Sequence, residues 1–241
     1  MVKISYPPPT RNISPQWFEL KPGTTIQRIF DPTSYGATAT GFRYYGPLSR
    51  FDHHNSQKLG IDKERGIIYA GLNLSCCLVE VFGDDETIKI QKQQIAFINL
   101  KQSLKLLDLR KSGAWDAGSV AAMAVDGRRK LTQAWSRYFY ENPDLYENIE
   151  GLIFNNAHDG QMAIALYERA ASKLSSADVS ILDLNEPTIR ETVLAIATRL
   201  NLRRVQLIRK LKKIPSEKIK VLTQMEKCLV LKILSSLFSV M

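Results

Sequence analysis

The spacing of apolar residues changes from segment to segment and predicts both strands and helices. Thr25–Phe30 alternates with a period of two, which places Ile26, Arg28 and Phe30 on one face of a strand. Other runs predict strands at 66–70, 95–98, 104–108, 151–154 and 162–167, and helices at 72–82 and 119–140. Because these elements lack a regular βαβ rhythm, the pattern predicts an α+β fold rather than a doubly wound one.

The same pattern divides the chain into three parts. Residues 1–16 are rich in proline and polar residues and are expected to form an extended arm. Residues 17–175 contain the predicted strands and form the main domain. Residues 176–241 show helical spacing and predict a helical C-terminal appendage, whose last helix, at 219–237, is capped by Ser216. The apolar stripe of that helix leaves both internal packing and a homodimer open.

Composition and targeting signals predict a cytoplasmic protein. Hydrophobic residues make up 44% and charged residues 24% of the chain, a balance typical of a globular protein with a core. The three cysteines, two of them adjacent, indicate neither a disulfide framework nor a zinc motif. The N-terminus lacks the apolar segment of a signal peptide. No run reaches the ~18 apolar residues of a membrane span, so no membrane partner is expected.

The net charge of +9 is concentrated in one segment. Residues 199–220 hold nine basic residues and a single acid, Glu217. The main domain has no excess of basic residues, which argues against a nucleic-acid-binding surface there. The segment itself leaves three interpretations open: a solvated or partner-facing helix face, a nucleic-acid contact, or a membrane-surface helix.

The stretch from Arg50 to Glu80 contains the residues with the clearest chemistry. Glu80 falls inside the apolar run Leu78–Phe82, where an ionised carboxylate is costly to bury without a partner. Carboxylates near arginines are common in functional sites. The Asp52-His53-His54 run is favoured as a polar loop over a metal site, because adjacent histidines cannot easily face one ion from a strand. No metal is therefore expected.

Four ordered motifs resemble the RES domain family, which is named for its Arg, Glu and Ser. They are Arg28-Ile29-Phe30, then Gly46-Pro47-Leu48-Ser49-Arg50-Phe51-Asp52, then Ile68-Tyr69-Ala70 with Leu78-Val79-Glu80-Val81-Phe82, and last Gly151–Asn156 with Ala163–Ala170. The resemblance spans roughly residues 17–172. Each motif is short, and it is their order along the chain that carries the resemblance.

This resemblance implies a fold similar to that of ADP-ribosyltransferases, with a mixed β core and flanking helices. RES proteins are typically toxins of bacterial toxin–antitoxin pairs with an Xre-type antitoxin, and members consume NAD⁺ or use it to ADP-ribosylate a target. Carried over to this chain, Arg28 is the first Arg of the family and Arg50 the second basic site. Tyr69 is the pocket aromatic residue and Glu80 is the Glu. Water, phosphate and a protein side chain all stay open as the acceptor.

The residue types suit the chemistry of NAD⁺. A guanidinium holds a pyrophosphate by paired, charge-assisted hydrogen bonds, and Tyr69 or Tyr45 offers a face for the nicotinamide ring. Glu80 is the candidate for stabilising the oxocarbenium character that develops when the nicotinamide–ribose bond breaks. Two alternatives stay open at this point: Glu80 as the structural partner of an arginine, and Tyr69 as an ordinary core residue.

Asn156 departs from the family pattern, because it stands where the resemblance places the Ser. An amide donates and accepts hydrogen bonds, so Asn156 can hold a ribose hydroxyl or the nicotinamide carboxamide. It cannot act as a hydroxyl nucleophile. The sequence therefore predicts an NAD⁺-consuming toxin with Asn156 in its site, or else a catalytically weakened RES-like module that binds an antitoxin or nucleotide without turnover.

Overall fold

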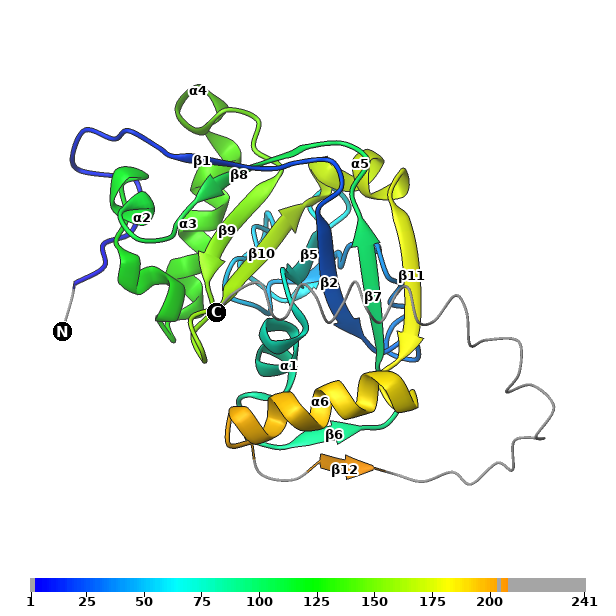
Figure 1. Ribbon diagram of the computed structural model, residues 1–241. Coiled ribbons are helices and arrows are strands. Elements are labelled where there is room, and N and C mark those ends of the chain that lie inside the picture. Colours follow the sequence, from blue (N-terminus) through cyan, green and yellow to red (C-terminus); the bar gives the residue numbers. More distant parts are fainter. Residues whose placement is uncertain (1–2, 203–204, 208–241) are drawn as a thin grey trace, which may run out of the picture.

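The computed structural model describes residues 3–202 and 205–207, which are arranged around a mixed eight-stranded sheet (Figure 1). The strands follow one another across the sheet in the order β1 (Trp17–Leu20), β8 (Leu104–Asp108), β9 (Gly151–Asn155), β10 (Met162–Tyr167), β5 (Ile67–Gly71), β2 (Thr25–Phe30), β7 (Gln94–Asn99) and β11 (Asp178–Asp183). Neighbouring strands are antiparallel except β8 and β9, which are parallel. Strands and helices do not alternate regularly, and the predicted α+β fold is confirmed.

The sheet consists of two blocks that meet at β5 and β2. Only one residue pair, Gln27 with Gly71, joins these two strands in the described ladder, whereas β2 pairs with β7 over six residues. Each block therefore has its own continuous ladder. The junction is the least regular part of the sheet, and the helix α1 (Leu74–Phe82) starts directly after it.

The two faces of the sheet have separate cores. One face packs Ile26 and Phe30 of β2 with Ile68 and Leu106, and is closed by the short helices η2 (Glu168–Ala170) and α5 (Ala171–Ser175). The opposite face holds Phe51, Trp135 and Phe139 beneath a helical layer. That layer consists of α2 (Gly113–Asp116), η1 (Ala121–Val125), α3 (Arg129–Glu141) and α4 (Pro143–Tyr146).

A third core lies on the second face, under α1. Leu74, Leu78 and Phe82 of α1 pack with Ile189 and Val193 of the helix α6 (Pro187–Arg199). The helix α1 is thus enclosed between the sheet and α6. The strand β12 (Val205–Leu207) follows α6 and pairs in parallel with β6 (Ile88–Ile90). A separate pair, β3 (Tyr45–Gly46) and β4 (Gly60–Ile61), carries the 54–64 loop.

Most predicted elements are present, and the bounds of two helices differ from those predicted. The helix predicted at 72–82 begins at Leu74, because Asn73 caps it by accepting a hydrogen bond from the Cys76 N–H at 2.8 Å. The helix predicted at 119–140 is broken into η1 and α3, since residues 126–128 leave helical geometry and include Gly127.

The helical spacing expected from residue 178 onward is wrong for its first part. Residues 178–183 form the edge strand β11, which pairs with β7 of the main sheet. The six-residue strand was too short to distinguish from the start of a helix. The helical spacing expected for this part of the chain is present further on, as α6. The one expected at 219–237, with most of the basic 199–220 segment, lies outside the described residues.

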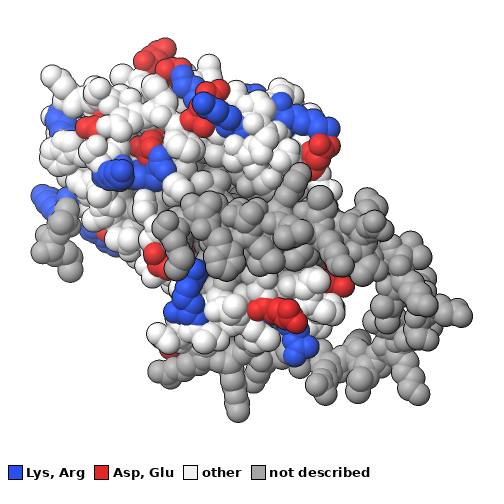
Figure 2. All heavy atoms as spheres, viewed as in Figure 1, with Lys and Arg blue, Asp and Glu red and all other residues white. Residues whose placement is uncertain are grey.

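On the face shown in Figure 2, basic and acidic side chains lie close to one another in the same regions. Among the described helices, none is long and apolar enough to cross a membrane.

Candidate functional site

Glu80 lies on α1 and has no hydrogen bond or ion pair with any described residue. Its side chain reaches solvent, yet surrounding protein atoms desolvate it enough to raise the pKa of the carboxyl above its ordinary value. Asp159 and Asp84 raise that pKa further, while Arg50 and His158 lower it. The carboxylate is thus faced by charges of both signs but bonded to none.

Arg50 is held in place by hydrogen bonds to Asp126, which precedes α3, and to Thr132 of α3. The Arg50 Nε donates to the carbonyl of Asp126 at 3.4 Å, and the Arg50 carbonyl accepts from Thr132 Oγ1 at 2.7 Å. Its guanidinium is the strongest of the cations that favour the charged form of Glu80. Arg50 and Glu80 are therefore near enough to interact electrostatically, and their predicted roles in a site stay predictions.

The 156–160 loop, between β9 and β10, runs along the Glu80 face of α1. Asn156 contacts Cys76, which lies one helical turn before Glu80, with 3.5 Å between Nδ2 and Sγ. The His158 ring packs on Gly83, which lies one turn after Glu80. A methyl group at Gly83 would come within 2.7 Å of the ring Nδ1. The loop thus places His158 next to Glu80.

His158 is the residue that sequence reasoning missed. Nothing in the local sequence connects it to a glutamate 78 positions earlier. In the structure its Nε2 lies 3.7 Å from an oxygen of Asp84, and its charged form stabilises ionised Glu80. The only available signal was its place directly after the motif containing Asn156.

Asn156 is buried and its amide is fully used within the loop. Its Oδ1 accepts from the backbone N–H groups of His158 and Asp159 at 2.8 and 2.9 Å. Its Nδ2 donates to Asp159 at 2.6 Å and makes the contact with Cys76. An amide has two donors and two acceptor lone pairs, so none is left for a ligand. Asn156 holds the shape of the loop that carries His158, and its predicted contact with a substrate stays a prediction.

Tyr69 belongs to a buried centre around Asp52. The Asp52 side chain is fully buried and accepts hydrogen bonds from Arg43 Nη2 at 2.8 and 2.9 Å, from the backbone N–H groups of Leu48 and Ser49, and from the Tyr69 hydroxyl at 3.0 Å. The same hydroxyl accepts from the Phe51 N–H. Burial, then the Asp52 charge, raises the pKa of Tyr69 well above its ordinary value, so the phenol stays neutral.

Arg28 lies on the opposite face of the sheet from α1. It alternates with Ile26 and Phe30, as predicted, and its Nη1 donates to the carbonyls of Thr38 and Gly41 at 2.9 Å. Burial and the nearby Arg43 lower the pKa of the guanidinium to about 10, so it stays charged. The structure does not bring Arg28 to the same sheet face as Glu80, because a strand sends successive side chains to opposite faces.

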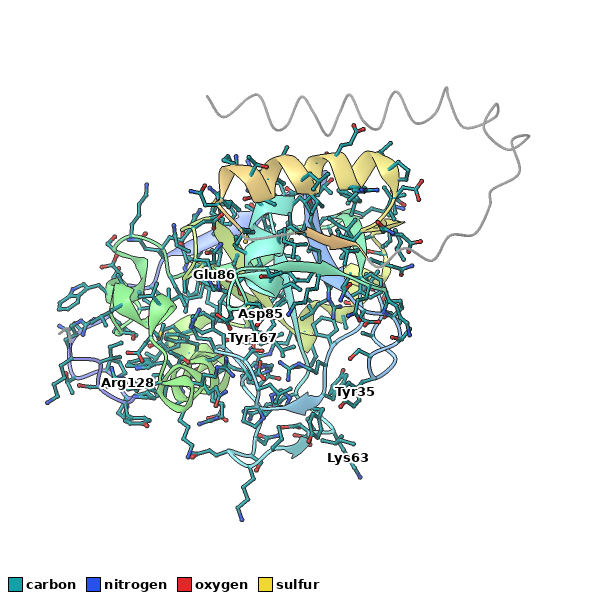
Figure 3. The ribbon with its side chains drawn as sticks, turned by 90° about the horizontal axis from the view of Figure 1, so that it is seen from below. Tyr35, Lys63, Asp85, Glu86, Arg128 and Tyr167 are labelled. Carbon is teal, nitrogen blue, oxygen red and sulfur yellow. The ribbon has the colours of Figure 1, made fainter. Side chains whose placement is uncertain are left out.

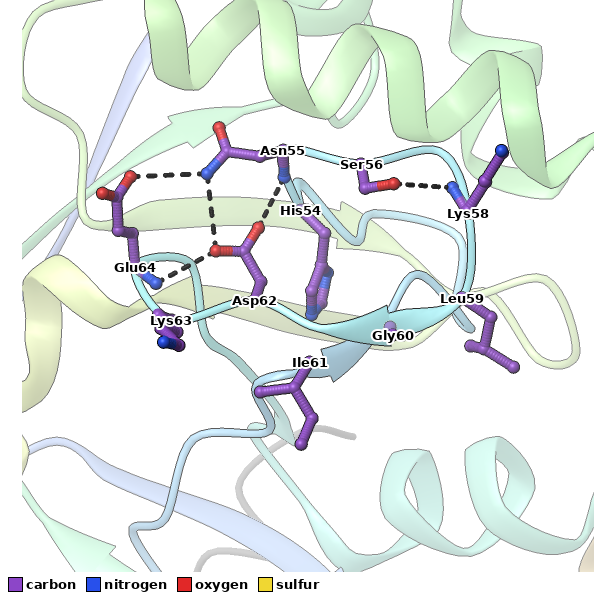
Figure 4. A pocket seen from close by; sticks show the side chains of 11 residues that line it. His54, Asn55, Ser56, Lys58, Leu59, Gly60, Ile61, Asp62, Lys63 and Glu64 are labelled. Atoms are coloured by element: carbon purple, nitrogen blue, oxygen red, sulfur yellow. Dashed lines mark hydrogen bonds between the residues drawn. The ribbon is translucent and has the colours of Figure 1, made fainter.

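Tyr45 lies on the β3–β4 pair, with a half-exposed ring. Beside it, the 54–64 loop and Gly46 line a cavity of about 450 Å³ (Figure 4). Neither Tyr45 nor Glu80 lines that cavity. Arg50, Glu80 and the 156–160 loop thus lie near one another. The site roles predicted for Arg28 and Tyr45 stay predictions.

The Asp52-His53-His54 run is buried, in contrast to the polar loop expected from the sequence. His53 shares a hydrogen bond with Glu168 at 3.0 Å, and its ring packs against the rings of Tyr140 and Tyr167, which also contact each other. Both ring nitrogens of His54 are buried without a hydrogen-bond partner. In the part of the chain that the structure describes, no group of three or more His, Cys, Asp or Glu side chains could hold a metal ion.

Comparison with known families matches the RES domain over residues 25–187, more than half of the chain. The chain belongs to the RES domain family. No curated protein matches it. A chain of the crystal structure of the M. tuberculosis MbcT–MbcA toxin–antitoxin complex is similar, with a TM-score of 0.49 and 14% identity, covering 72% of this chain and 90% of that chain.

The RES match confirms the family that the sequence motifs predicted, and its bounds agree with the fold. It begins at the first residue of β2 and ends at the first residue of α6. The candidate site, from Arg50 to the 156–160 loop, lies inside the RES domain. The described residues before β2, which include β1, lie outside the matched range, as does α6 after Pro187.

Proposed function

We propose that this RES protein is the toxin of a toxin–antitoxin pair and that it cleaves the nicotinamide–ribose bond of NAD⁺. Family membership and the likeness to a chain of a toxin–antitoxin complex support the toxin role. The observation that carries the chemistry is Glu80, a partly desolvated carboxylate without a bonded partner among the described residues. Such a group is available for a substrate, whereas a structural carboxylate is already bonded.

Each residue then has a chemical role. The Glu80 carboxylate faces the positive charge that develops on the ribose as nicotinamide leaves. Arg50 favours the ionised form of Glu80 and can hold a phosphate oxygen through its free guanidinium nitrogens. His158 is positioned to accept the proton that a water or hydroxyl acceptor loses when it attacks the ribose carbon. The half-buried Tyr69 ring and Arg28 keep their predicted NAD⁺ contacts as part of the proposal.

Nicotinamide release from NAD⁺ by the purified protein, without antitoxin, tests this proposal. Glu80→Gln removes the charge and keeps the shape, so we expect release to fall by roughly a hundredfold or more, with stability unchanged or slightly higher. Asp85→Asn, three residues after α1 ends and exposed, is the matched control. No release by the wild type, or equal release by Glu80→Gln, would contradict the proposal.

The pH profile gives a second readout of the same assignment. Because the pKa of Glu80 is raised, activity should fall on acidification at a higher pH than an ordinary glutamate would give. Arg50 lowers that pKa, so Arg50→Gln should move the acid limb to still higher pH. An unmoved limb would show that Arg50 does not act on the titrating group.

A second function is favoured by one observation, the saturation of Asn156. With no free hydroxyl or amide at the position of the family Ser, the site can bind a nucleotide or antitoxin without turnover. Calorimetric binding of NAD⁺ by the wild type without nicotinamide release would favour this weakened module. An Xre-type antitoxin is the proposed partner in either case, cytoplasmic location is the proposed setting, and a homodimer remains a prediction.

A further inference from the structure

The helix α6 begins where the RES domain match ends, and it covers the outer side of the helix that carries Glu80 (Figure 3). Its apolar residues Ile189, Val193 and Ile196 are buried against Leu74 and Leu78 of α1. Figures 1 and 3 both show α6 lying across α1. This packing fixes α1 between the sheet and a helix that lies almost entirely outside the matched range.

A polar contact extends from the end of α6 to the 156–160 loop. The Arg199 Nη2, on the last residue of α6, donates to Ser75 Oγ at 2.9 Å. The Ser75 side chain is almost fully buried, and its hydroxyl donates a hydrogen bond to Asp159 Oδ2 at 3.4 Å. Asp159 Oδ1 in turn accepts from Asn156 at 2.6 Å. The serine hydroxyl thus bridges a cation on α6 and a carboxylate on the loop.

The charge of Arg199 strengthens this bridge. A hydroxyl that accepts from a guanidinium becomes a better donor, so its bond to the Asp159 carboxylate tightens. Asp159 also bonds the Gln161 N–H at 3.1 Å, and Asn73 before α1 donates to the Gln161 side chain at 3.1 Å. Hydrogen bonds therefore connect both ends of the loop to the start of α1, and the one through Ser75 also involves Arg199 of α6.

We propose that α6 is a positioning element of the candidate site, and that Arg199, acting through Ser75 and Asp159, fixes the 156–160 loop so that His158 stays beside Glu80. Arg199 touches neither residue and is a positioning residue. In the sequence Arg199 belongs to the basic 199–220 segment, whereas in the structure it donates a hydrogen bond to Ser75 of α1. The activity readout of this inference rests on the proposed function, and the structural readout does not.

The structural readout is amide hydrogen exchange of residues 156–161 in the full-length protein. Arg199→Gln should speed exchange in this loop about fivefold, as expected for loss of one charge-assisted bond, and leave the sheet unchanged. Arg190→Gln is the control, because Arg190 lies on the same helix without a hydrogen bond or ion pair among the described side chains. Equal exchange in the two variants would overturn the proposal.

Two further variants separate positioning from general stability. Ser75→Ala should change exchange in the loop as Arg199→Gln does, and the double variant should add nothing, since both break one chain of bonds. Arg199→Lys, which keeps the charge, should restore part of the protection. Additive effects, or no rescue by lysine, would overturn the role of the bridge.

The activity readout then connects the loop to catalysis. In Arg199→Gln, kcat for nicotinamide release should fall about fivefold while KM changes less, because a displaced His158 affects the chemical step. A wild type that releases no nicotinamide would overturn the proposed function, and the exchange data would still decide the role of α6. Faster exchange with unchanged kcat would overturn the catalytic part of the inference.

Discussion

Asp52 and Glu80 are both carboxylates of the 50–80 stretch, and their surroundings are opposite. Asp52 is fully buried and accepts five hydrogen bonds, from Arg43, two backbone N–H groups and Tyr69. Glu80 reaches solvent and accepts none from the described residues. A buried carboxylate must be paired to be tolerated, so Asp52 organises the fold, whereas the unpaired Glu80 remains available for a ligand.

The comparison extends to the residues around each carboxylate. The Asp52 centre joins the turn before it to β5 through Tyr69 and to the 43–45 segment through Arg43. The Glu80 centre is formed by a helix, a loop and Arg50, with electrostatic contacts in place of bonds. The saturated centre fixes the 43–52 segment to β5, and the unsaturated one keeps free polar atoms where a substrate could bind.

The largest expected effect is on the Asp52 centre. Asp52→Asn leaves the Arg43 guanidinium without its anion and turns an amide toward two backbone N–H donors, so unfolding should become easier by about 3 kcal/mol. Asp126→Asn, which breaks a more exposed pair with Arg128, should cost less than about 1 kcal/mol. Urea denaturation measures both. Similar losses for the two variants would remove the distinction between a structural and a peripheral carboxylate.

The next effect concerns the loop beside Glu80. Asn156→Ser restores the residue type that the family resemblance places there, but serine cannot cap two backbone N–H groups and donate to both Asp159 and Cys76. We expect a loss of about 1 kcal/mol in stability and lower nicotinamide release. Higher release by the serine variant would show that Asn156 is a weakened catalytic residue rather than a loop-positioning one.

The smallest effect is on His54, next to the Asp52 centre. Burial lowers the pKa of His54, and Arg43 and His53 lower it too, while Asp52 and Asp62 raise it. The unfolded chain therefore binds the proton more readily, and stability falls as pH drops through about 6.5. His54→Phe removes two unpartnered nitrogens and should reduce this pH dependence by a few tenths of a kcal/mol, measured by urea denaturation at pH 7.5 and 5.5. An unchanged dependence would assign it to other groups, with His53 the first to test.

The sequence predicted much of the fold because periodicity reports local geometry. The alternation at 25–30 placed Arg28 correctly with Ile26 and Phe30, and the helix predicted at 72–82 is present as α1. Periodicity could not show which sheet face carries the site. Arg28 and Glu80, both assigned by the family motifs, therefore turned out to lie on opposite faces.

Only part of the site could be predicted, because sequence motifs do not show which segments meet in space. Arg50 and Glu80 were found from their motifs, but the neighbourhood of Glu80 depends on a loop that returns from residue 156. Whether a side chain such as Asn156 is free or saturated depends on its partners in space, which sequence order does not contain. His158 and Arg199 were missed because their contacts join segments far apart in the chain.

The enclosure of α1 has a consequence for how the protein is made. Leu74, Leu78 and Phe82 emerge from the ribosome early, but Ile189 and Val193, which cover them, follow more than a hundred residues later. At about 5–20 residues per second, this apolar strip stays uncovered for roughly 5–20 s of synthesis. At this stage Arg50 and α1, which carries Glu80, have been synthesised, but α6 has not. The apolar residues of α1 are then exposed to chaperones and to aggregation.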